Sequence, residues 1–206
     1  MYADRKTLVR REIWNLLEEK NLVDFPRPCY GRIPNFKKAG VAAEKILTLK
    51  EFSVSKCVFC TPDAVLRRVR QIVLEQGKTL AVALPHMEAF VEIDERKNVS
   101  EATRISGMRR YGSPLRTKID LFVQGSVAVD LYGNRLGKGK GYGDSEYFIL
   151  KERGLMSENA KVVTIVHHLQ IVRDLRKLMS KRDVGIDYVI TPDEILKTRA
   201  FNETQS

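Results

Sequence analysis

Apolar residues recur along this chain in two patterns, one typical of helices and one typical of buried strands. Near the N-terminus, apolar side chains at helical spacing predict a helix that begins at about Asp4, which we expect to be its N-cap. The stripe on this helix contains Val9, Ile13, Trp14, Leu16 and Leu17. Prolines punctuate residues 24–36 and predict an irregular connection, and the apolar residues of 42–47 predict a short helix after it.

From residue 56 onward, short apolar runs alternate with helical stretches. We predict strands at 56–60, 79–84, 119–123, 127–129, 161–166 and 187–190. The sequence Thr61-Pro62-Asp63 predicts a capped helix with a proline at its first position, and Gly77 ends it. Further helices are expected from Ser100 and from about Asp144 to Glu152. This alternation favours an α/β fold with a mainly parallel sheet between helices.

The length and composition of the chain are consistent with one domain. With 206 residues and 43% apolar composition, the chain can bury one sizeable core, and no linker-like segment interrupts it. We therefore predict a single domain over 1–206, with a flexible tail from about 198. No apolar run approaches the about 20 residues that cross a bilayer, and the N-terminus resembles neither a secretory nor a transit signal. These features predict a cytoplasmic protein with no membrane partner.

The three cysteines make a disulfide framework improbable because their number is small and odd. Cys57 and Cys60 have the spacing of a metal or redox motif, but they lie in a predicted strand. Side chains three residues apart on a strand point to opposite faces, and no second Cys or His pair lies nearby to complete four zinc ligands. We interpret both thiols as core residues.

The net charge of +10, from 36 Lys and Arg against 26 Asp and Glu, favours anionic partners such as nucleotides, folate tails or nucleic acid. The cations occur in short clusters, and for any one cluster a solvated helix face is the favoured interpretation. The charge alone therefore excludes few functions.

A glycine-rich segment at 133–144 carries the most specific chemistry. It contains five glycines and three cations, Arg135, Lys138 and Lys140. Glycines allow successive backbone N–H groups to face one anion, and the cations supply opposite charge, so we expect bound phosphate and test ATP first. The spacing is neither a Walker A motif nor a dinucleotide fingerprint. The alternative that remains open is an exposed basic hairpin.

Polar residues at predicted strand ends are further pocket candidates. His86 follows one strand, and His167 and His168 follow another. Ligands of open α/β sheets bind beyond the carboxyl ends of the strands. For each histidine, a hydrogen-bonded surface or core group remains the more common alternative.

At the glycine-rich segment the chain resembles the 5-formyltetrahydrofolate cyclo-ligases, also called methenyltetrahydrofolate synthetases. Their signature is matched at Gly133, Arg135, Leu136, Gly137, Gly139, Gly141, Tyr142 and Asp144. The segments at 6–10 and 77–85 and the residues Gln170, Asp183, Asp187 and Thr191 also fit the family pattern. A divergent branch, the methenyltetrahydrofolate synthase domain-containing proteins, is more similar still at 24–28, 32–36, 125–129, 137–142, 146–147 and 162–167.

The resemblance implies a three-layer α/β/α sandwich, of the kind shared with sugar-phosphate isomerases and CoA transferases. It also implies an ATP- and Mg²⁺-dependent ring closure, in which 5-formyltetrahydrofolate becomes 5,10-methenyltetrahydrofolate and ADP and phosphate are released. The implied nucleotide-binding residues are Lys6, Arg10, Gly137, Lys138, Gly139, Gly141, Tyr142 and Asp144, with Arg135 and Lys140 as the catalytic cations. For Asp144, two roles stand equal: contact with Mg²⁺ and helix N-cap.

Several positions depart from the family pattern. Gly143 replaces the second tyrosine of the signature and Ser145 replaces its arginine, while the glutamate of the pterin pocket is matched at best by Asp63. The nucleotide half of the site is therefore better supported than the folate half. The alternative functions are a non-catalytic nucleotide- or RNA-binding protein, with Tyr111 beside two arginines as the RNA signal, and an enzyme for another substrate on the same fold.

Overall fold

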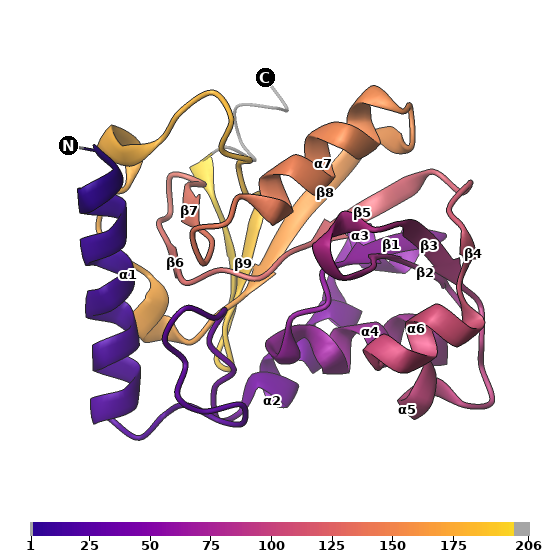
Figure 1. Cartoon of the computed structure of the whole chain (residues 1–206), viewed down its shortest axis with the longest axis horizontal. Coiled ribbons are helices and arrows are strands. Elements are labelled where there is room, and N and C mark those ends of the chain that lie inside the picture. Colours follow the sequence, from indigo (N-terminus) through magenta and orange to yellow (C-terminus); the bar gives the residue numbers. More distant parts are fainter. Residues whose placement is uncertain (1, 200–206) are drawn as a thin grey trace.

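An eight-stranded sheet forms the centre of the computed structural model, which describes residues 2–199 and the side chains of 5–199 (Figure 1). The strand order is β10-β9-β8-β5-β1-β2-β3-β4. The five parallel strands are β1 (Cys57–Cys60), β2 (Thr79–Ala83), β5 (Ile119–Val123), β8 (Met156–Ile165) and β9 (Tyr188–Ile190). The antiparallel edges are β3 (Phe90–Ile93), β4 (Ser113–Pro114) and β10 (Ile195–Lys197).

Helices cover both faces of this sheet. They are α1 (Tyr2–Glu19), α2 (Ala39–Glu44), α3 (Lys50–Val54), α4 (Arg67–Glu75), α5 (Val99–Ala102), α6 (Ile105–Tyr111) and α7 (Tyr142–Glu152). Short 3-10 turns lie at Lys45–Thr48, Ala64–Leu66, Pro85–Met87, His168–Gln170 and Arg176–Leu178. In the view of Figure 1, α7 lies above the sheet and α4 below it, which gives the three expected layers. The predicted α/β fold with a mainly parallel sheet is confirmed.

Alternation along β1 shows how the sequence builds these layers. Val58 and Cys60 pack in the larger core with α1, α2 and α4, whereas Cys57 and Phe59 pack in a second core with α7. Phe59 stacks on Phe122 of β5 at 4.5 Å between ring centroids. Every β1 side chain is buried, which explains why the strand is a continuous apolar run in the sequence.

The interpretation of the two β1 cysteines as core residues is confirmed. Cys57 and Cys60 are free thiols buried on opposite faces of the sheet. Removal from water raises the pKa of each thiol to about 12, so both stay protonated at neutral pH.

Three predicted helix starts are wrong in detail. The first helix begins at Tyr2, so Asp4 lies within it. Pro62 is not the first residue of α4, because a 3-10 turn (Ala64–Leu66) lies between them. The Thr61 hydroxyl donates to Asp63 (2.8 Å), which leaves 61–63 irregular. Asp144 is not the N-cap of α7: Gly141 is, with a φ of +69°. A glycine there lets the chain turn sharply out of the preceding loop.

The ends of the chain bear on two further expectations. Of the expected flexible tail at 198–206, residues 200–206 lie outside the described residues, but Thr198 is buried and donates to the carbonyl of Ile186. The tail therefore does not start at 198. Within residues 2–199, none of the helices has the length and apolar character needed to span a membrane.

The predicted strand at 127–129 forms a small hairpin outside the main sheet, β6 (Ala128–Val129) with β7 (Arg135–Leu136). Asp130 is fully buried at its turn. One carboxylate oxygen accepts from the backbone N–H of Tyr132 (3.0 Å) and of Asn134 (2.9 Å), and the other accepts from Leu175 (2.7 Å). This carboxylate thus ties the hairpin that leads into the glycine-rich loop to the 170s segment.

We predict that Asp130→Ala lowers the free energy of unfolding by about 3 kcal/mol, because it leaves buried N–H groups unpaired. Asp130→Asn should cost less because one acceptor oxygen remains. Urea titration followed by circular dichroism measures both values. Asp193→Ala, at an exposed aspartate, is the control and should change stability by less than about 0.5 kcal/mol. Equal losses in Asp130→Ala and the control would contradict the role of the buried carboxylate.

Candidate functional site

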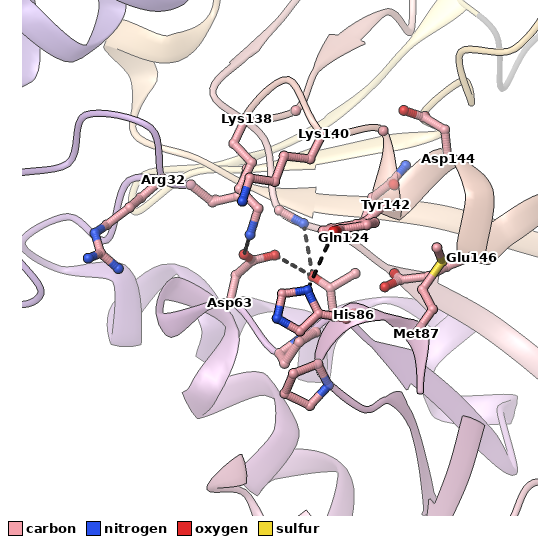
Figure 2. A pocket seen from close by; sticks show the side chains of 18 of the residues that line it. Arg32, Asp63, His86, Met87, Gln124, Lys138, Lys140, Tyr142, Asp144 and Glu146 are labelled. Atoms are coloured by element: carbon pink, nitrogen blue, oxygen red, sulfur yellow. Dashed lines mark hydrogen bonds and ion pairs between the residues drawn. The ribbon is translucent and has the colours of Figure 1, made fainter. Parts of the chain in front are cut away.

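A pocket of about 360 Å³ opens at the carboxyl ends of β1, β2 and β5, where ligands of parallel sheets bind. Its walls are residues 61–64 after β1, 84–87 after β2 and 124–125 after β5, together with much of the glycine-rich loop and the first turns of α7. Pro26, Arg32, Ile33 and Ile105 complete the rim. Figure 2 shows lysines, carboxylates and His86 around one opening.

The loop at 137–141 depends on glycine for its shape. Gly139 and Gly141 have φ values of +104° and +69°, in the left-handed region that favours glycine. No side chain among the described residues caps α7, so the N–H groups of its first turn remain free to face a ligand at the pocket. A helix N-terminus of this kind attracts anions.

Two loop lysines lie over the pocket. In Figure 2, Lys138 and Lys140 both extend from the loop toward Asp63. Lys138 Nζ is 3.5 Å from Asp63 Oδ1, a weak ion pair, whereas Lys140 is exposed. The two ammonium groups and the start of α7 make this side of the pocket positive.

Arg135 lies beneath the loop, with its side chain only 3% exposed. Its guanidinium donates to the carbonyl of Gly125 (3.1 Å) and to Asp144 Oδ1 (3.0 Å). The same oxygen of Asp144 accepts from the N–H of Val184 (3.0 Å). These contacts join the end of β5, the loop, α7 and the segment that contains Val184, which we call the 180s segment.

The N-terminal residues Lys6 and Arg10 reach the same region from α1. Arg10 Nε donates to the carbonyl of Gly137 (2.6 Å), and Lys6 Nζ lies 2.9 Å from both oxygens of Asp183. Neither side chain lines the pocket, but Arg10 also lies 3.6 Å from the point where a Cβ on Gly139 would be. The structure therefore brings Arg10 to the loop and Lys6 to its supporting segment.

Of the three candidate histidines, only His86 lines the pocket. Its Nδ1 is 3.5 Å from the Tyr142 hydroxyl, and the two rings meet edge to face. His167 Nδ1 accepts from the N–H of Leu169, which fixes the following turn. His168 packs against His167 at 4.1 Å between ring centroids. The pair at 167–168 thus has a structural explanation.

Two polar residues in the pocket wall were not predicted as site residues. Glu146 on α7 is 5% exposed, and its Oε2 has no hydrogen-bond partner among the described residues. The amide N and O of Gln124, after β5, are also buried without a partner there. The sequence did contain one indication of the burial of Glu146. Glu146 precedes the apolar Leu150 by four residues, so both side chains lie on the inward face of α7.

The environment of Glu146 disfavours its charged form. Burial is the main cause, and the nearby negative charge of Asp63 adds to it, so the pKa of Glu146 rises to about 8. Arg135 and Lys138 oppose this shift only in part. Glu146 is therefore mostly a neutral carboxylic acid at neutral pH.

The residues at the pocket also fit a magnesium ion. Mg²⁺ is usually held by one or two carboxylates together with substrate phosphates. The carboxylates of Asp63 and Asp144 line the pocket beside the loop. However, no group of three His, Cys, Asp or Glu side chains in 5–199 gathers closely enough to hold a metal by itself. In Figure 2 the Asp144 carboxylate points away from the pocket centre.

The fold is shared with solved bacterial structures. The 5,10-methenyltetrahydrofolate synthetase of Aquifex aeolicus aligns with a TM-score of 0.61 and 19% identity, over 94% of this chain and 93% of that one. A 5,10-methenyltetrahydrofolate synthetase from Mycoplasma pneumoniae aligns with a TM-score of 0.52 and 15% identity, over 90% and 97%. At these identities the likeness shows the fold alone.

Sequence relatives are more similar. Methenyltetrahydrofolate synthase domain-containing proteins of Bos taurus and Homo sapiens are each 38% identical over 201 residues, or 92% of this chain. The chain spans about half the length of these relatives, 53% and 52% respectively. The model of the 5-formyltetrahydrofolate cyclo-ligase family matches residues 3–192. The resemblance seen in the sequence is thus confirmed, and the chain belongs to the 5-formyltetrahydrofolate cyclo-ligase family.

Proposed function

We propose that this protein is an ATP-dependent cyclo-ligase that converts 5-formyltetrahydrofolate, or a related formyl-pterin, to 5,10-methenyltetrahydrofolate with release of ADP and phosphate. One observation carries the proposal: the left-handed Gly141, two lysines and an uncapped helix N-terminus all meet at a pocket beyond the parallel strands. Membership of the cyclo-ligase family supports the reaction class.

The phosphates of ATP are assigned to the loop. Backbone N–H groups around Gly137, Gly139 and Gly141 and the first turn of α7 would cradle them, with Lys138 above. Tyr142 lies at the start of α7 and lines the same side of the pocket. Arg10 fixes the loop from outside through its bond to Gly137, so its proposed contribution to nucleotide binding is indirect.

In the proposed reaction, the formyl oxygen attacks the γ-phosphorus and the bond to ADP breaks. The amine N10 then attacks the activated carbon, and phosphate leaves as N10 loses its proton. Such phosphoryl transfer depends on positioning and on neutralising the charge that spreads over phosphate oxygens. Lys140, exposed over the pocket, supplies a mobile positive charge, and Arg135 supplies a fixed one beneath the loop. Mg²⁺ held on the phosphates would add further charge neutralisation.

The pocket also offers apolar contact to a flat heterocycle. Ile33, Leu84, Pro85, Met87 and Ile105 are among its lining residues. A heterocycle bound against them would hold its formyl group toward the phosphates on the loop. We assign the pterin to this part of the pocket.

We predict that the purified protein, given ATP, Mg²⁺ and 5-formyltetrahydrofolate, produces the near-ultraviolet chromophore of the methenyl product. Absorbance measured with and without ATP tests this directly, because the proposed ring closure requires phosphoryl transfer. Absence of product above the ATP-free background, in protein shown to bind ATP, would remove folate from the proposal.

We predict that Gly139→Val abolishes stabilisation by ATP. A side chain at a φ of +104° strains the loop by about 1–3 kcal/mol. In the wild type, ATP at about a hundred times its Kd should raise the unfolding free energy by about 2.7 kcal/mol. The matched control is Gly154→Val, which also has a positive φ but has open space around it at the far end of α7. ATP stabilisation that survives in Gly139→Val would refute the cradle.

We predict that Lys140→Ala lowers kcat by about a hundredfold, because one positive group is lost from the developing phosphate charge. ATP should still raise the melting temperature, since the backbone cradle remains. Lys151→Ala, at an exposed lysine of α7, is the control and should keep the wild-type kcat. An unchanged kcat in Lys140→Ala would exclude this lysine from the chemical step.

A further inference from the structure

Glu146 and Gln124 stand out because the proposed phosphate chemistry uses neither of them. Both line the pocket, and both are almost fully buried. Three of their side-chain polar atoms, Glu146 Oε2 and both amide atoms of Gln124, have no partner among the described residues. Buried polar groups are nearly always hydrogen-bonded, and an unpaired one costs about 1–3 kcal/mol. This cost points to a ligand as the missing partner.

The two residues share one wall of the pocket. Gly143 lies three residues before Glu146, on the same side of α7. A Cβ at Gly143 would lie 3.1 Å from Gln124 Oε1 and 3.0 Å from an Arg135 nitrogen. A side chain as large as tyrosine therefore does not fit there without moving Gln124. The position of Gln124 in this pocket thus depends on having glycine at 143, where the family has tyrosine.

Four charged groups, from different segments of the chain, lie near Glu146. Asp63 comes from the segment after β1, Arg135 from β7, Lys138 from the loop and Asp144 from the first turn of α7. Figure 2 shows the Glu146 carboxyl directed into the pocket, on the side of His86 away from Asp63. The unpaired Oε2 of Glu146 is an acceptor in the pocket wall, and the unpaired amide of Gln124 adds one donor and one acceptor.

We propose that Glu146, supported by Gln124, recognises the lactam edge of the substrate heterocycle, in which a ring N–H lies beside a carbonyl oxygen. Glu146 Oε2 accepts from the ring N–H, and the amide N–H of Gln124 donates to the ring carbonyl. This assignment rests on the proposed function, because a pterin with a 4-oxo group is the heterocycle that the reaction requires. It makes Glu146 a specificity-determining residue rather than part of the phosphate chemistry.

A matched pair of ligands isolates this edge. Folic acid and its 4-amino analogue, aminopterin, differ only in whether position 4 of the ring carries oxygen or an amino group, and the amino form lacks the lactam edge. At about pH 7 the wild type should bind folic acid more tightly than aminopterin by about tenfold. Glu146→Ala should lose this preference, whereas Glu146→Gln should keep it because its amide also offers a donor and an acceptor. Titration calorimetry measures the affinity of both ligands for the wild type and for each of the two variants.

The outcomes separate this inference from the proposed function. Wild-type preference for folic acid that disappears in Glu146→Ala supports the inference, even if the methenyl product never forms. Product formation by the wild type, with an equal preference for folic acid in the wild type and in Glu146→Ala, overturns the inference and leaves the proposed function standing. Failure of the wild type to bind folic acid overturns the inference, whereas the assay for the methenyl product decides the proposed function separately.

Discussion

The buried guanidinium of Arg135 is the interaction on which the site depends. It joins the carbonyl at the end of β5 to Asp144 on α7, and Asp144 accepts in turn from the backbone of the 180s segment. A buried cation is tolerated only when it is paired and hydrogen-bonded, so these partners cannot move apart cheaply. The loop above Arg135 has little packing of its own. Its glycines keep their shape because the two ends of the loop are fixed by this ion pair and by the hairpin at Asp130.

The pocket combines two kinds of lining. Cations and a helix N-terminus lie along the loop, whereas apolar side chains and the buried carboxyl group of Glu146 line other parts of the pocket. A ligand with an anionic end and an uncharged heterocyclic end matches this division.

Much of the central fold could be predicted from the sequence, because a strand covered on both faces gives a continuous apolar run. Residues 57–60 and 79–83 are of this kind. The edge strands β3 and β10 were missed, since Phe90–Ile93 includes a glutamate and Ile195–Lys197 is only three residues long. The glycine-rich loop was found because its composition is unusual. Glu146 and Gln124 were not proposed as site residues, because a single polar residue shows its burial only when distant segments come together.

The contacts of α1 place a constraint on synthesis of the chain. Arg10 bonds a residue 127 positions later, and Lys6 pairs with Asp183, 177 positions later. The ribosome delivers the N-terminal end first, and domains generally form as units once their parts have emerged. Arg10 and Lys6 of the first helix therefore cannot form these two contacts until the chain has been translated as far as Gly137 and Asp183, respectively. The site that this helix borders is completed among the last events of cotranslational folding.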